Sequence, residues 1–206
     1  FGADGRLLLA KGTVLTPTFI RRLRELGFRR VYVENEWAPD LEIDEAVTEE
    51  TQRQAQAIVR EALAAVEANA PLRPGRIRAV IDRILDELQR HEDVLCGLSA
   101  IRCWDDYTFV HSVNVTILTL VVARSLGYGE SELRALGVGA MLHDIGKVKV
   151  PRELLQRPAR LSEEEFQRVQ RHTEYGFDVL RRHFDVHLLS AHVALQHHER
   201  LDGSGY

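Results

Sequence analysis

From Thr48 onward, apolar residues recur every three or four positions, and proline or glycine interrupts this spacing only at intervals. Such spacing places the apolar side chains on one face of an α-helix. The first two apolar stripes are Ala55, Ile58, Ala62 and Val66, and then, after Pro71 and Pro74, Ile77, Ile81, Ile84 and Leu88. The sequence therefore predicts a mainly α-helical fold from about residue 48.

The chain begins with a different pattern. Turn signals at Asp4-Gly5 and Lys11-Gly12 enclose an apolar run, a short helix is expected from Pro17 to Gly27, and "RRVYVEN" at 29–35 is typical of a strand. We expect residues 1–43 to form a small α/β module. Residues 44–102 are expected to be linking amphipathic helices that serve core packing or connection, with a dimer-forming helix pair as the minor alternative.

The segment from Asp105 to Gly127 is apolar nearly all round, which predicts a central helix. Asp105 or Asp106 can cap its start and Gly127 its end. We expect three further helices. They begin at Ser131, at the capping-box pair Ser162 and Glu165 with an end near Leu180, and at Val186 with an end at Glu199.

Composition excludes several classes of protein. The 206 residues carry a formal net charge of −4, which gives no general basic surface for a nucleic acid polymer. No apolar run is long enough to span a bilayer, and we expect no signal peptide. Cys96 and Cys103 are expected to be reduced thiols, so we expect a cytoplasmic protein.

Several histidines fall on helix faces that the pattern assigns to the interior. His111 shares a face with Val115, Leu118 and Val122, which predicts a core face. Any one such residue would more often be a satisfied core histidine than a ligand. Unpaired buried imidazoles would each cost roughly 1–3 kcal/mol, and a shared metal removes that cost for all of them. The inward-facing histidines are His111, His143, His172, His197 and His198.

The remaining histidines are interpreted as structural residues. His91, His183 and His187 have charged surroundings and are expected to be solvated, and His192 is expected near the site or on the surface.

Imidazoles with a carboxylate and no thiolate suit iron, manganese, zinc or nickel. Five histidines and Asp144 are too many for one catalytic ion with an open position, so an aspartate bridging two ions fits better. Two ions about 3.5–4 Å apart are usual for in-line displacement at phosphorus. Lys147 then has two interpretations, a point charge on a phosphate oxygen or a solvated lysine after a glycine.

Four motifs carry a family resemblance. "YTFVHSVNV" around His111, "HDIGK" at 143–147, "HTEYG" at 172–176 and "HHERLDGSGY" at 197–206 resemble the HD-GYP branch of the HD metal-dependent phosphohydrolases. The resemblance covers about half of the chain, from Asp105 to Tyr206, and implies an HD-type helical bundle around a metal centre, expected at residues 103–206. It also implies a phosphodiesterase that converts cyclic di-GMP to pGpG, and in some members to GMP, in bacterial signalling.

By position, the resemblance implies two divalent ions, most often iron or manganese. His111, His143 and Asp144 would hold one ion, and Asp144 would bridge to the second, held by His172, His197 and His198. Lys147 would contact the scissile phosphate. A loop beside the site would be shaped by Asp202, Gly203, Gly205 and Tyr206.

Two departures and two alternatives accompany this interpretation. Tyr107 stands one turn before His111, where members with a third metal place a glutamate, which favours two ions. The family's downstream carboxylate ligand and arginine segment lie after Tyr206, so we expect the first ion to lack one ligand here. The alternatives are an HD phosphohydrolase of another nucleotide, which the "GSGY" loop disfavours, and a non-catalytic receptor binding diguanylate cyclases, which the intact ligand set disfavours.

Overall fold

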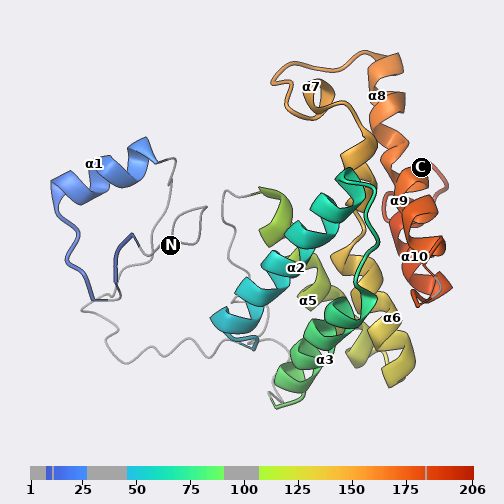
Figure 1. Cartoon of the computed structure of the whole chain (residues 1–206), viewed down its shortest axis with the longest axis horizontal. Helices are drawn as coiled ribbons and strands as arrows, with labels where there is room; N and C mark the ends of the chain where they lie inside the picture. Colours follow the sequence, from blue (N-terminus) through green and yellow to red (C-terminus); the bar gives the residue numbers. More distant parts are fainter. Residues whose placement is uncertain (1–7, 11, 27–45, 91–106, 184) are drawn as a thin grey trace.

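The computed structural model describes residues 8–10, 12–26, 46–90, 107–183 and 185–206, without the side chains of residues 107 and 108. These residues form helices and no strand (Figure 1), which confirms the predicted mainly α-helical class. The helices are α1 (Pro17–Glu25), α2 (Glu49–Glu67), α3 (Pro74–Arg90), α5 (Tyr107–Ser125), α6 (Glu130–Met141), the 3₁₀ helix η1 (Ile145–Lys149), α7 (Arg152–Leu155), α8 (Glu163–Gln170), α9 (His172–Arg181) and α10 (Leu188–Gln196).

The predicted N-terminal helix is confirmed, because α1 begins at Pro17 and the Thr16 side chain caps it by accepting from the Phe19 N–H. The expected strand at 29–35 lies outside the described residues, as do His91, both cysteines and the two aspartates at 105–106. The domain boundaries therefore stay a prediction.

One hydrophobic core joins α2 and α3 to the helices that carry the histidines. The α3 stripe is confirmed, since all four of its predicted residues are buried. The α2 stripe is shifted: Val59 is buried, whereas Ile58 and Val66 are only half-buried. This shift arises because α2 contacts both α3 and α5, so its buried face runs through Ala55, Val59 and Ala62.

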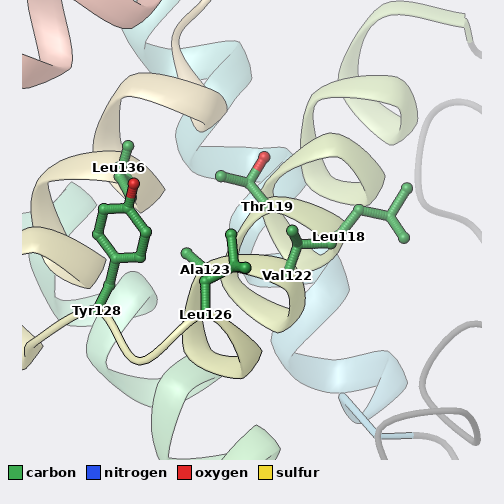
Figure 2. A pocket seen from close by; sticks show the side chains of 7 residues that line it. All are labelled: Leu118, Thr119, Val122, Ala123, Leu126, Tyr128 and Leu136. Atoms are coloured by element: carbon green, nitrogen blue, oxygen red, sulfur yellow. The ribbon is translucent and has the colours of Figure 1, made fainter.

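The predicted core face of α5 is wrong. Val122 is 53% exposed, Val115 and Leu118 are only half-buried, and His111 itself is exposed. Because α5 is apolar on every side, its sequence could not show which side α2, α3 and α6 would cover. The uncovered side forms a shallow apolar groove (Figure 2), lined by Leu118, Thr119, Val122, Ala123, Leu126, Tyr128 and Leu136.

Two glycines permit close backbone approaches that place the histidine-bearing segments. A Cβ on Gly139 would lie 2.7 Å from the Val193 Cβ, so α6 and α10 touch at this point. The Ser190 hydroxyl fastens the same pair of helices by donating to the Ala135 carbonyl oxygen at 2.7 Å. A Cβ on Gly146 would collide with the α9 backbone, so η1 lies directly against α9. Figure 1 shows α9 and α10 side by side near the C-terminus.

Several helix ends differ from the predictions. Gly127 ends α5 as expected, with a φ of 80°. However, α6 is capped at Gly129, whose N–H donates to the Glu132 carboxylate, so it begins before Ser131. The capping box of Ser162 and Glu165 is confirmed, but its helix breaks at Arg171 into α8 and α9. The last helix spans only Leu188–Gln196, so two histidines follow its end.

Among the described residues, no helix combines the length and the apolar character needed to cross a bilayer.

Candidate metal centre

Four separate segments bring the predicted donors together. His111 comes from α5, His143 and Asp144 from the turn between α6 and η1, His172 from the first position of α9, and the last two histidines from the turn after α10. The donors form two groups, in each of which the ligand atoms lie within 4.8 Å of one another. These groups are His111, His143 and Asp144, and His172, His197 and His198.

Three of the imidazoles are oriented by backbone carbonyls three residues earlier in the chain. The Nδ1–H of His143 donates to the Ala140 oxygen at 2.7 Å, and that of His172 donates to the Val169 oxygen at 2.7 Å. His197 Nδ1 is 3.0 Å from the Ala194 oxygen. These carbonyl partners assign the proton to Nδ1, so each Nε2 presents a lone pair to the site.

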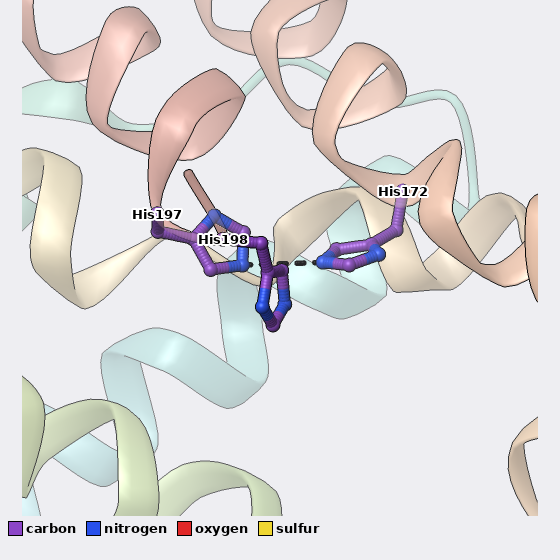
Figure 3. Close-up of side chains that lie close together, drawn as sticks. All are labelled: His172, His197 and His198. Atoms are coloured by element: carbon purple, nitrogen blue, oxygen red, sulfur yellow. Dashed lines mark hydrogen bonds between the residues drawn. The ribbon is translucent and has the colours of Figure 1, made fainter. Parts of the chain in front are cut away.

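Two of these lone pairs face each other. His172 Nε2 and His197 Nε2 are 3.2 Å apart, the contact drawn in Figure 3, and the His198 ring lies beside them. Burial lowers the pKa of His172, which keeps this ring neutral at pH 7. If both rings donate from Nδ1, neither has a proton left for the other, so a cation between them stabilises the arrangement.

Asp144 supplies the negative charge at the same point. Its Oδ1 is buried and has no hydrogen-bond partner among the described residues. The Nε2 atoms of His172 and His197 are each 3.6 Å from this oxygen, which is too far for a good hydrogen bond. An orphaned carboxylate oxygen that faces imidazole lone pairs is costly unless a cation joins them. This donor set fits a divalent metal.

The second oxygen of Asp144 has two partners. His143 Nε2 is 3.3 Å from Oδ2, and the Lys147 ammonium donates to Oδ2 at 2.7 Å. Burial alone would raise the pKa of Asp144, but its contacts with His143 and His197 and the charge of Lys147 hold this pKa well below its usual range. Asp144 is therefore ionised at neutral pH, as a metal ligand must be.

Two further histidines, His198 and His111, are held neutral as well. Burial lowers the pKa of His198 to about 4, with neighbouring His197 and His172 adding to the effect. Burial, followed by His143, lowers the pKa of His111. Both rings are thus in the protonation state that binds metal at pH 7.

The predicted loop is folded back onto this centre. Asp202 Oδ1 accepts from the N–H and the hydroxyl of Ser204, and Gly203 adopts a φ of 73°. A Cβ on Gly205 would lie 2.5 Å from the His198 carbonyl oxygen, so only glycine allows this approach. As a result the Tyr206 ring stacks on the His198 ring, with centroids 4.6 Å apart and planes at 18°.

The residues interpreted as structural stay outside the two groups. His187 caps α10 by accepting from the Leu189 N–H, and His192 contacts the Phe177 ring at a centroid distance of 5.3 Å. The Tyr107 side chain lies outside the described part of the chain. Sequence reasoning missed Phe166, whose ring contacts Tyr206, because no periodic pattern distinguishes this residue.

Comparison with protein families matches residues 84–206 to the family described as HD domain. Two curated relatives are the cyclic di-GMP phosphodiesterase PA4108 of Pseudomonas aeruginosa and the cyclic di-GMP phosphodiesterase response regulator RpfG of Xanthomonas campestris pv. campestris. They are 39% and 35% identical over 127 and 120 residues. A third relative, the 3'3'-cGAMP-specific phosphodiesterase 1 of Vibrio cholerae, is 39% identical over 100 residues.

These matches cover 62%, 57% and 48% of this chain, but only 31%, 32% and 23% of the respective relatives. The chain therefore spans a third or less of the length of each of these three. No solved structure matches the chain.

Proposed function

Because the chain belongs to the HD domain family, we propose that it acts as a metal-dependent phosphodiesterase that hydrolyses cyclic di-GMP to pGpG, and further to GMP where both bonds are cleaved. Membership in this family agrees with the HD-GYP resemblance that the histidine motifs predicted. The observation that carries the proposal is the convergence of the orphaned Asp144 oxygen with the Nε2 atoms of His172 and His197.

In this proposal the centre would take two divalent ions, iron or manganese. His111, His143 and Asp144 would hold one ion, and His172, His197 and His198 would hold the other, with Asp144 as a ligand to both. Bound divalent ions would supply Lewis-acid activation of water and neutralise charge on the phosphodiester.

Other groups of the chain orient these donors. The carbonyls of Ala140, Val169 and Ala194 fix the tautomer and the ring direction of three imidazoles. Lys147 pairs with Asp144 in the free protein, but its side chain is 36% exposed. A half-buried lysine beside a buried carboxylate can rotate its ammonium toward a phosphate oxygen, so Lys147 is proposed to bind the scissile phosphate.

The substrate class rests on the named relatives. PA4108 and RpfG are named for cyclic di-GMP, whereas the Vibrio cholerae relative is named for 3'3'-cGAMP. Both molecules are cyclic dinucleotides, so a cGAMP phosphodiesterase is the second candidate. Binding to a diguanylate cyclase, homodimerisation and a cytoplasmic location stay predictions from the sequence.

Hydrolysis by the full-length protein tests the proposal. The protein should be purified without air, loaded with iron or manganese, and given cyclic di-GMP, 3'3'-cGAMP and linear dinucleotides. We expect cyclic di-GMP to be cleaved with the highest kcat/KM, and Asp144→Asn to abolish cleavage while the helical circular dichroism is kept. A metal-loaded protein that binds cyclic di-GMP but leaves it intact would support the receptor alternative instead.

A further inference from the structure

Phe166 is an aromatic residue with no role in the hydrophobic core. It lies on α8, none of whose residues is fully buried, and its side chain is 42% exposed. Apolar area left in water can still be buried by a ligand, which contributes roughly 25 cal/mol per Å². An exposed ring held beside a candidate active site is therefore a candidate contact for a ligand.

Phe166 stands at the outer end of a row of rings that starts at the metal centre. The His172 and His198 rings are in contact, with centroids 5.1 Å apart, and Tyr206 stacks on His198 at 4.6 Å. The Phe166 ring meets Tyr206 at 6.1 Å with an interplanar angle of 78°. Two ring-to-ring steps thus separate Phe166 from a predicted metal ligand.

Polar contacts stabilise the start of the helix that bears Phe166. Ser162 and Glu165 cap its start, and the Arg157 guanidinium donates to the Glu165 carboxylate at 2.6 Å. These contacts keep the first turn of α8 helical although the helix buries no residue. Phe166 is consequently presented to solvent on an ordered backbone, which lowers the conformational entropy lost when a ligand binds.

We propose that Phe166 is a stacking platform for a nucleobase of the cyclic dinucleotide substrate. This inference rests on the proposed function and adds to it a residue that binds the base. A nucleobase is joined to its phosphate through one ribose, a reach that suits the two ring steps from Phe166 to the histidines. Aromatic faces bind bases of any identity by stacking, and no charge is needed at this end of the site.

The test measures steady-state hydrolysis of cyclic di-GMP by the metal-loaded full-length protein and its Phe166 variants. Phe166→Ala should raise KM by about 5- to 150-fold, the range expected for losing one base–aromatic stack, with a smaller change in kcat. Phe166→Leu keeps apolar contact with Tyr206 but has no π face, so it should resemble the alanine variant. Phe166→Trp should restore the wild-type KM.

A matched control and a spectroscopic readout separate stacking from packing. Tyr128 is an aromatic residue of similar exposure, 44%, in the apolar groove of α5, and Tyr128→Ala should leave KM unchanged. A cyclic dinucleotide that carries 2-aminopurine in place of one guanine should lose fluorescence on binding the wild-type protein, and much less on binding Phe166→Leu.

Two outcomes would overturn different claims. If Phe166→Leu has the wild-type KM and quenches the fluorophore fully, the Phe166 ring only covers Tyr206. The proposed stacking role is then wrong, while the proposed function stands. If the metal-loaded wild-type protein cleaves no cyclic dinucleotide, the proposed function itself is wrong, and the platform falls with it.

Discussion

Replacing Gly146 by alanine should separate η1 from α9 and thereby disrupt the metal centre. The added Cβ would lie 2.5 Å from the Gly176 nitrogen and closer still to the His172 carbonyl oxygen. Both are backbone atoms of α9, so no side chain can rotate away. Restoring an ordinary contact of at least 3.4 Å to that nitrogen requires the two segments to move apart by about 0.9 Å, and the closer carbonyl oxygen requires a larger movement.

This displacement sets the expected magnitude. Gly146 lies two residues after Asp144, and the atoms it contacts belong to the ligand segment of α9, so the Asp144–His172 distance must change with it. Overpacking of this kind costs about 3 kcal/mol, which lowers Tm by about 6–12 °C for a chain of this size. A misplacement near 1 Å in an active site reduces turnover by about 100-fold.

Thermal unfolding and hydrolysis of cyclic di-GMP by the full-length protein measure both effects. Gly75→Ala is the matched control, because a Cβ at Gly75 in the first turn of α3 would meet nothing within 4 Å. That variant should be as stable as the wild type or slightly more stable, since alanine favours a helix. If Gly146→Ala unfolds at the same temperature as Gly75→Ala and keeps full activity, the close approach of η1 and α9 does not position the ligands.

Three further predictions concern single features of the site. Lys147→Met should lower kcat by about 100-fold or more, the usual effect of losing one charge-stabilising donor, while metal content stays at the wild-type level; loss of the metal instead would assign Lys147 a purely structural role. The stability of the metal-free protein should fall as the pH is lowered from 6.5 toward 4, because the folded His198, with a pKa of about 4, stays neutral while the unfolded imidazole takes up a proton. Urea unfolding at pH 7 and pH 5 measures this loss, and a His198→Ala variant with an equally steep dependence would show that the burial of His198 is not its source. Gly205→Ala should lift the loop from the His198 backbone and unstack Tyr206, which a chelator titration would record as weaker metal binding; unchanged affinity would mean that the loop does not support His198.

Much of the site could be predicted from the sequence because each donor is embedded in a strong local pattern. Gly139 and Gly146 mark close approaches, and the structure brings together all six donors that the motifs indicated. The predicted convergence did not depend on exact helix ends. His197 and His198 follow α10 rather than lie within it, yet their rings still reach His172.

The errors have physical causes that a single sequence conceals. The segment 162–180 has helical spacing throughout, and the break between α8 and α9 falls at an arginine, Arg171, rather than at a proline or glycine. The sequence therefore gives no sign of this break. The uncovered side of α5 depends on where α2, α3 and α6 pack, which is tertiary information. Neither periodicity nor a motif predicts a role for Phe166, because that role depends on a contact with Tyr206, 40 positions later in the chain.

Metal content tests the central claim most directly. The full-length wild-type protein and its Asp144→Asn variant should be purified without air, and their bound metals counted by elemental analysis. We expect about two iron or manganese ions per wild-type chain and a large loss in the variant, because Asp144 presents its orphaned oxygen to His172 and His197. A wild-type protein that hydrolyses cyclic di-GMP with no bound metal, or an Asp144→Asn variant with full metal content, would contradict this account.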